Sequence, residues 1–390
     1  MNTAPAYPTA SHAPTPTAKP QDTGYGRARL RLGITGVGLW VVVSIGLLAA
    51  GAADPIADQL PAGLAGDALL VALLLAAYVL IQLPLDWLGG YAVPKRFARR
   101  VQPLGAYLYT LARGITAHTT ILFFSAAVLY AGGLLGGWPG AFAAGVAWML
   151  CLAAVRGTVA GIVARLASPT NREDQTGTKL QLSSDEGFTG GITGLLAPRT
   201  SILPSAWKEN LSDDQFELAL ARRQTVMRDG LWLRGRLGAI GFTAAGLLIA
   251  LLLAGPSSAG TGVGVVETGL WFTLWSFVGL LFLPSLSRAA IYTTDEKLKQ
   301  QGVPQERFEA LTHALDQLQD GEPVRGRWVE RVFHPIPSAS NRITEPGTTG
   351  GYWDIARTSV YLGLGSMSLL TRSVHCNVGR PALWVWLPTD

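Results

Sequence analysis

Residues 114–155 read GITAHTTILFFSAAVLYAGGLLGGWPGAFAAGVAWMLCLAAV and contain no Asp, Glu, Lys or Arg. This uncharged stretch is about twice as long as the ~20 residues that a helix needs to cross the apolar core of a bilayer. Near its middle, residues 136–140 read Gly-Gly-Trp-Pro-Gly, a combination that breaks helices and forms tight turns. The stretch therefore predicts two membrane-spanning helices joined as a hairpin.

The composition of the whole chain also indicates a membrane protein. Of its 390 residues, 49% are hydrophobic and 15% are charged, and the mean hydropathy is +0.29. Soluble domains carry roughly 25% charged residues. Four more uncharged runs have the length of a span: Gly33–Ala53, Ala68–Leu85, Leu237–Pro256 and Thr268–Ser287. We therefore expect a mainly α, polytopic helical membrane protein with about six spans.

The distribution of basic residues predicts how these spans are oriented. Lys and Arg beside the ends of spans are retained on the cytosolic side. They precede the first span, follow the second and surround the insert after the fourth, whereas the opposite loops carry acids or no charge. We expect an integral protein of a bacterial cytoplasmic membrane, with both termini and the insert in the cytosol.

The net charge of +5 comes mostly from this membrane-proximal set of basic residues. It favours contact with the lipid bilayer, and the chain shows no motif of basic and aromatic residues typical of nucleic-acid binding. The expected partners are therefore bilayer lipids and no nucleic acid.

These features divide the chain into six parts. Residues 1–26 are rich in Pro, Ala and Thr and predict a disordered tail. We then expect four membrane helices in 27–167, a cytosolic insert in 168–230, a membrane hairpin in 231–291, a cytosolic helical part in 292–345, and an interfacial or buried C-terminal tail in 346–390.

Local signals in the insert predict a small α+β domain. Short strands are expected at Lys179–Leu182 and Thr200–Leu203, with a glycine-rich extended stretch at Gly187–Leu195 between them. A helix follows, with Ser212 as its N-cap and Gln215 as the capping-box partner three residues later.

This order of elements resembles the HtpX and CAAX prenyl endopeptidase family of membrane zinc metallopeptidases. In that family a glycine-rich edge strand precedes a capped helix, and Leu-Ala on this helix precedes the zinc-binding His-Glu-x-x-His. Here Leu-Ala is followed by Arg222, Arg223, Gln224, Thr225 and Val226. The resemblance implies a gluzincin-like fold for the insert and places both histidine ligands and the general-base glutamate at substituted positions.

Two further segments carry the resemblance. The family has Ser-Arg-x-x-Glu-x-x-x-Asp after the sixth span, and the matching stretch that starts at Ser287 has Ile291 at the position of the third zinc ligand and retains Asp295. His334-Pro335 and the later Arg342-Ile343 are similar to the family's His-Pro and Arg-Ile near the active-site cleft. The resemblance thus implies degenerate ligand positions at Arg222, Arg223, Val226 and Ile291, and cleft residues at Asp295, His334 and Arg342.

Zinc is bound by imidazole, thiolate or carboxylate, whereas a guanidinium stays protonated and has no lone pair to donate. We therefore expect no catalytic residue, no metal and no cofactor, where active members of the family hold zinc. Arg222 and Arg223 remain open to three interpretations. They are solvated surface charges paired with Asp213, Asp214 or Glu217, or they bind an acidic group in the former metal cavity, or Arg222 pairs with Asp295 and fills that cavity.

Three functional hypotheses follow. The first is a catalytically inactive membrane metallopeptidase homologue that acts as a scaffold or regulator and binds a peptide or membrane-protein client along the edge strand at Gly190 and Gly191. The second is an active zinc endopeptidase with displaced ligands at His334, His375 and Cys376. The third is a conduit for lipids or small molecules through the spans.

Overall fold

The computed structural model describes residues 24–99, 101–164, 179–183, 191–193, 200–319, 321–344 and 367–385. Within these ranges, five helices are long and apolar enough to cross a membrane. They are α1 (Gly24–Ala49), α3 (Leu64–Trp87, continued by the π-helical turn η1, Leu88–Ala92, and α4, Val93–Arg96), α5 (Leu104–Ala164), α8 (Leu231–Ala254) and α9 (Gly262–Gln300). The short α2 (Ala53–Ala57) and the 3-10 turn η2 (Pro256–Ser258) join them at one end.

The helix α5 folds back on itself as the hairpin that the sequence predicts. Its backbone leaves the helical conformation at Gly136 and Gly137, and Gly137 has a φ of 60°, which favours glycine. The two arms pack closely, because a Cβ on Gly132 would lie 2.6 Å from the carbonyl oxygen of Gly140. Trp148 Nε1 also donates to Ser125 Oγ across the arms at 2.8 Å. Each arm exceeds the ~20 residues that a bilayer core requires.

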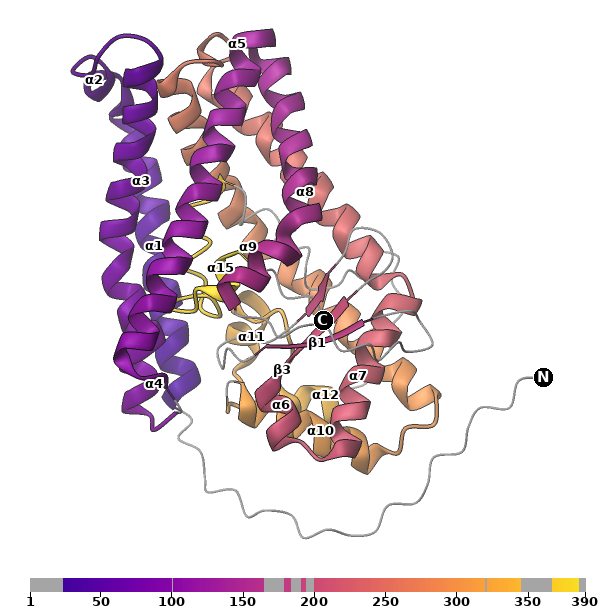
Figure 1. Ribbon diagram of the computed structural model, residues 1–390. Coiled ribbons are helices and arrows are strands. Elements are labelled where there is room, and N and C mark those ends of the chain that lie inside the picture. Colours follow the sequence, from indigo (N-terminus) through magenta and orange to yellow (C-terminus); the bar gives the residue numbers. More distant parts are fainter. Residues whose placement is uncertain are drawn as a thin grey trace.

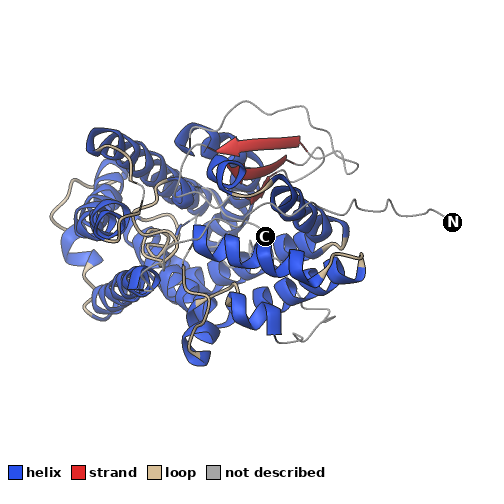
Figure 2. Cartoon of the chain, turned by 90° about the horizontal axis from the view of Figure 1, so that it is seen from below, coloured by secondary structure: helices blue, strands red, loops and turns tan. Residues whose placement is uncertain are grey.

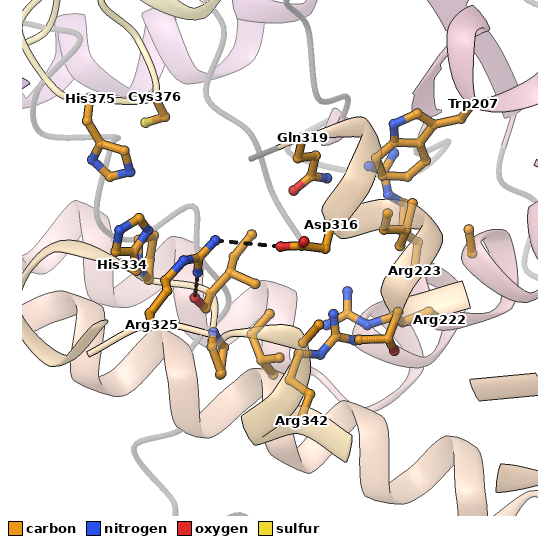
Figure 3. A pocket seen from close by; sticks show the side chains of 18 of the residues that line it. Trp207, Arg222, Arg223, Asp316, Gln319, Arg325, His334, Arg342, His375 and Cys376 are labelled. Atoms are coloured by element: carbon orange, nitrogen blue, oxygen red, sulfur yellow. Dashed lines mark hydrogen bonds and ion pairs between the residues drawn. The ribbon is translucent and has the colours of Figure 1, made fainter. Parts of the chain in front are cut away.

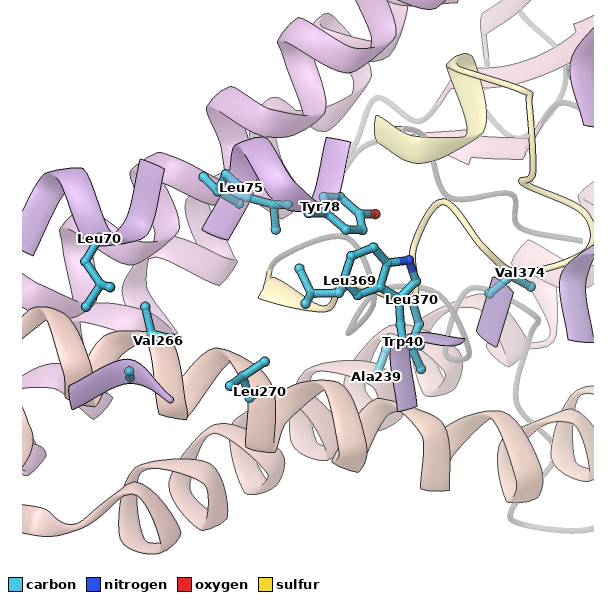
Figure 4. Packing of buried hydrophobic residues seen from close by; sticks show 12 residues of the cluster. Trp40, Leu70, Leu75, Tyr78, Ala239, Val266, Leu270, Leu369, Leu370 and Val374 are labelled. Atoms are coloured by element: carbon cyan, nitrogen blue, oxygen red, sulfur yellow. The ribbon is translucent and has the colours of Figure 1, made fainter. Parts of the chain in front are cut away.

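A buried apolar cluster joins α1, α3, α8 and α9 in the helix bundle (Figure 4). The rings of Trp40 on α1 and Tyr78 on α3 meet edge to face, with centroids 4.8 Å apart. Trp40 Nε1 donates to Gln82 Oε1 at 2.9 Å, so the indole has a partner at its polar end. Leu369, Leu370 and Val374 enter the same cluster from the far end of the chain.

Residues 367–385, which we call the C-terminal segment, lie inside the bundle rather than on its surface. Figure 1 shows the segment in yellow among α1, α3, α5 and α9, ending in α15 (Ala382–Val385). The Arg372 guanidinium is fully buried and forms an ion pair with Asp86 on α3, to which its Nε donates at 3.0 Å. Arg29 on α1 donates to the carbonyl oxygens of Gly89, His375 and Val378 at 2.6, 2.9 and 3.1 Å. The C-terminal segment therefore fills part of the bundle interior with polar as well as apolar contacts.

The remaining elements gather at one end of the long helices (Figure 1). We call them the sheet region: β1 (Lys179–Ser183), β2 (Gly191–Thr193), β3 (Thr200–Pro204), α6 (Ser205–Asn210), α7 (Asp213–Arg228), α10 (Gln305–Leu318), α11 (Arg327–Phe333) and α12 (Ala339–Thr344). Figure 2 shows the three strands side by side next to these helices. The order is β1-β3-β2, with β1 parallel and β2 antiparallel to β3.

The predicted strands and helix start of the sheet region are confirmed. The Ser212 hydroxyl accepts from the amide of Gln215 at 3.2 Å, and Gln215 Oε1 accepts from the amide of Ser212 at 3.1 Å, which completes the capping box. Trp207, Phe216, Phe308 and Leu298 then share one buried cluster, so β3, α6, α7, α10 and the end of α9 pack together. This packing fixes the face of α7 that carries Arg222 and Arg223.

Candidate functional site

The helices α7 and α9 bring three of the four degenerate motif positions to one cavity. Arg222 and Arg223 on α7 and Ile291 on α9 line a cavity of about 90 Å³. Val226 lies one turn further along α7, in a buried apolar cluster with Ile192, Trp232 and Ala290, and is not among the residues that line the cavity. We call this cavity the arginine cavity, because five arginines of the described residues line it: Arg222, Arg223, Arg325, Arg342 and Arg380. Figure 3 labels the first four.

Arg222 and Arg342 both bind Asp295 at this cavity. Arg222 Nε donates to Asp295 Oδ1 at 3.1 Å. Arg342 Nε donates to Oδ2 at 2.7 Å and a terminal nitrogen of Arg342 donates to Oδ1 at 2.9 Å. The three side chains are 4–9% exposed. Arg222 thus pairs with Asp295, as the third interpretation expects. Arg342 adds a bidentate contact to the same carboxylate that sequence reasoning missed.

Arg223 is also buried, at 2% exposure. Its Nη1 donates to the carbonyl oxygen of Ile202 in the central strand β3, and its guanidinium lies 5.4 Å from the centroid of the Trp207 ring. Arg222 is 7% exposed. Neither guanidinium is therefore the solvated surface charge of the first interpretation; Asp214, one of the acids considered there, instead accepts from Arg307 Nε at 2.8 Å.

The loop between α10 and α11 supplies Arg325, a residue that sequence reasoning missed, to the cavity. Arg325 donates to the carbonyl oxygen of Ile336 at 3.2 Å and lies 3.9 Å from carboxylate oxygens of both Asp316 and Glu322. These residues follow no periodic or motif pattern in the sequence. The resemblance placed Arg342 at the cleft, whereas the position of Arg325 at the same cavity is visible only in the folded chain.

Two histidines meet at the opposite side of the cavity in Figure 3. The ring centroids of His334 and His375 are 4.9 Å apart, and both side chains line the cavity together with Cys376. Cys376 Sγ lies 3.3 Å from Asn377 Oδ1. Asp295, in contrast, has both carboxylate oxygens bound by arginines.

The donors present do not fit a zinc ion. Zinc sites in proteins use three or four His, Cys, Asp or Glu ligands. Among the described residues, no group of three or more such side chains is placed to hold a metal ion. At the motif positions the cavity presents two guanidiniums and an isoleucine, none of which can donate an electron pair to a cation.

The glycine-rich edge strand is described only in part. Gly191 begins β2, which pairs with β3 on one side and forms an edge of the sheet, whereas Gly190 lies outside the described residues. The carbonyl oxygen of Ile192 in β2 accepts from Arg236 Nη2 on α8 at 3.4 Å. Gly191 and Ile192 are buried, so this edge lies close to α7 and α8 rather than open to solvent along its full length.

Comparison with solved structures identifies a chain with the same fold. The crystal structure of S. mikatae Ste24p superimposes with a TM-score of 0.63 at 13% sequence identity, covering 82% of this chain and 86% of that chain. No protein-family model and no curated protein matches the sequence. Because the sequence identity is this low, the comparison concerns the arrangement of the chain in space. This chain therefore has the fold of Ste24p.

Proposed function

We propose that this chain is a catalytically inactive homologue of the membrane metallopeptidases that binds a peptide or membrane-protein client without cleaving it. Ste24p is a CAAX prenyl endopeptidase, a zinc metalloprotease, and the shared fold supports descent from such an enzyme. The observation that carries the proposal is the Arg222–Asp295–Arg342 cluster at the position where the sequence motif of the family would hold zinc.

The net charge of the Arg222–Asp295–Arg342 cluster disfavours a metal ion at this position. A zinc peptidase polarises the scissile carbonyl with the metal, and a glutamate moves the protons. Two guanidiniums beside one carboxylate give the cluster a net positive charge, which repels a divalent cation. The position of the general base is held by Arg223, which cannot accept a proton. We expect the termini and the sheet region to face the cytosol, as the distribution of basic residues predicts.

A protease assay on the detergent-purified full chain tests this proposal. With casein as substrate, we expect no cleavage above the level of a mock purification, both before and after addition of micromolar zinc. Cleavage that o-phenanthroline abolishes would contradict the proposal. It would favour the second hypothesis, for which the contact between His334 and His375 is the supporting observation.

A substitution in the edge strand β2 tests the proposed client binding separately. An extended peptide that pairs with β2 needs the backbone N–H groups of that strand. Gly191→Pro changes the first residue of this three-residue strand, which pairs with Ile202 of β3, and so disrupts the edge. We expect capture of membrane-protein clients in a cross-linking pull-down to fall to background. The thermal unfolding midpoint of the variant must be measured beside it, since a proline cannot adopt the φ of 158° found at Gly191. Unchanged capture by a folded variant would rule out strand addition at β2.

A further inference from the structure

Cations outnumber anions in the arginine cavity. Five arginines line it, whereas Asp316 is the one carboxylate among its described lining residues. Two more carboxylates touch these arginines from outside the lining: Asp295 binds Arg222 and Arg342, and Glu322 lies 3.9 Å from Arg325. Among the described residues, five arginines and three carboxylates thus meet at a largely buried space, where charge interactions are screened less than at the surface.

The Arg222 guanidinium has one buried N–H donor without an acceptor among the described residues. Arg222 binds Asp295 through Nε, and among the described residues its Nη2 is a buried atom with no hydrogen-bond partner. Arg222 is 7% exposed and lines the cavity. A buried donor without an acceptor is costly and calls for an explanation such as an unseen ligand. An oxygen atom of a ligand in the cavity would satisfy Nη2.

The chemistry of the cavity favours a phosphate group. Guanidinium forks match the geometry of phosphate and carboxylate oxygens and bind them through charge-assisted hydrogen bonds. A phosphomonoester carries up to two negative charges and three terminal oxygens, whereas a carboxylate carries one charge and two oxygens. The phosphomonoester therefore offers more acceptor oxygens and more negative charge to Arg222 Nη2 and to the other arginines that line the cavity.

An apolar pocket beside the arginine cavity suggests where such a group comes from. This pocket, of about 320 Å³, lies between α1 and α9, and both Pro335 and His375 line it as well as the arginine cavity. Its other walls are nearly all apolar, including Ile34 and Leu281, which are 45% and 40% exposed on the outside of the helix bundle. An acyl chain could enter this pocket from the bilayer while a head group lies in the arginine cavity.

We propose that the arginine cavity binds a phosphate group, with Arg222 Nη2 as one of its donors, and that the adjoining apolar pocket accepts the tail when this phosphate belongs to a lipid. The inference rests on the proposed function in one respect, because it assigns a ligand to a cavity that holds no catalytic zinc. It concerns an anion and not a client protein, so its test needs neither cleavage nor client capture.

Native mass spectrometry and calorimetry on the full-length protein in detergent test the inference. Dioleoyl phosphatidic acid is compared with dioleoylglycerol, which has the same tails and no phosphate, and sodium phosphate is titrated separately.

Three variants accompany these titrations. Arg222→Gln removes the Nη2 donor, while Arg342 keeps its two hydrogen bonds to Asp295. Arg307→Gln, outside the arginine cavity, is the matched control. Arg380→Gln, at a half-buried lining position, is the second variant should Arg222→Gln fail to fold.

We expect one phosphatidic acid to bind per chain, at least tenfold more tightly than dioleoylglycerol. Arg222→Gln or Arg380→Gln should weaken this binding by about tenfold or more, as the loss of a charge-assisted hydrogen bond predicts, and Arg307→Gln should not. Binding of inorganic phosphate with the same dependence on Arg222, but no preference for phosphatidic acid, would support the phosphate site and assign it to free phosphate. The inference is overturned if neither phosphate compound binds, or if the cavity variants bind as tightly as the wild type. Zinc content and protease activity are measured independently of these titrations, so either proposal can fail alone.

Discussion

Asp295→Ala is expected to lower the free energy of unfolding by about 3–5 kcal/mol, the usual cost of removing one partner from a buried ion pair. Asp295 is 4% exposed at its side chain and is the acceptor for both Arg222 and Arg342. Without it, two guanidiniums remain in a low-dielectric environment, with the charge that the carboxylate had offset. The measurement is the midpoint of thermal or denaturant unfolding in detergent, monitored through tryptophan fluorescence.

Asp214→Ala is the matched control for Asp295→Ala. Asp214 also forms an ion pair, with Arg307, but the two side chains are 44% and 26% exposed. Ion pairs at such sites contribute about 0–1 kcal/mol, so the control should unfold close to the wild type. A small effect of Asp295→Ala, equal to that of the control, would mean that the cluster does not hold α7, α9 and α12 together. In that case the stability argument for the Arg222–Asp295–Arg342 cluster would be wrong.

Asp86→Ala is expected to have an effect of similar size in the helix bundle, again about 3–5 kcal/mol. Asp86 and Arg372 are both fully buried, and this pair links α3 to the C-terminal segment. The Asp86 carboxylate also accepts from the amide of Gly379 at 3.3 Å. Its removal leaves Arg372 buried with no carboxylate and should release the C-terminal segment from the bundle.

Limited proteolysis detects this release. In Asp86→Ala, a protease should remove the C-terminal segment at a rate at which the wild type remains intact, while Asp58→Ala, at an exposed loop position, should behave as the wild type. Replacing both partners, as in Asp86→Leu with Arg372→Met, should recover much of the stability, because an apolar pair leaves no unpaired charge. Equal proteolysis of Asp86→Ala and the wild type would show that the ion pair does not anchor the segment.

The parts of the fold that rest on local signals were predictable. The apolar runs gave the long helices, the Gly-Gly-Trp-Pro-Gly turn gave the hairpin of α5, and Ser212 with Gln215 gave the start of α7. Each of these features depends on residues that are near neighbours in the sequence. Membrane helices in particular satisfy their own backbone hydrogen bonds, so hydropathy alone locates them.

The position of the C-terminal segment was not predictable in the same way. Its contacts join residues far apart in the chain, such as Asp86 with Arg372, and nothing near Arg372 in sequence indicates that it lies inside the bundle. One signal was available: an acid at the end of an apolar run is costly in a membrane and indicates a buried partner. The sequence gives no indication of which arginine that partner is.

The residues of the candidate site also fall into two groups: those that a sequence motif indicated and those that only the packing of distant segments places there. The resemblance to the family motifs located Arg222, Ile291 and Asp295 and suggested that Arg222 pairs with Asp295. The bidentate contact from Arg342 and the positions of Arg325 and His375 depend on how a loop and the C-terminal segment pack around the cavity. Side chains from four separate segments converge there, and no local pattern specifies such a meeting.

A conduit for hydrophilic small molecules gains no support from the two described cavities beside the C-terminal segment. Where the C-terminal segment enters the bundle, the neighbouring cavities measure about 40 and 20 Å³ and are lined almost entirely by apolar side chains, with Met367 in both. A hydrophilic path needs polar groups along its length. The polar residues that lie deep in this part of the bundle, such as Gln82, Asp86 and Arg372, are instead bonded to one another or to the C-terminal segment.

Elemental analysis of the purified, full-length protein for zinc is the most direct test of the central claim that a guanidinium and carboxylate cluster occupies the metal position. The protein is expressed in zinc-supplemented medium, purified without chelators and analysed by inductively coupled plasma mass spectrometry. We predict zinc far below one equivalent per chain. The guanidiniums have no electron pair to donate, both oxygens of Asp295 accept from arginines, and the net positive charge of the cluster repels a cation. Zinc close to one equivalent per chain would contradict the account and would identify His334, His375 and Cys376 as the ligands to substitute next.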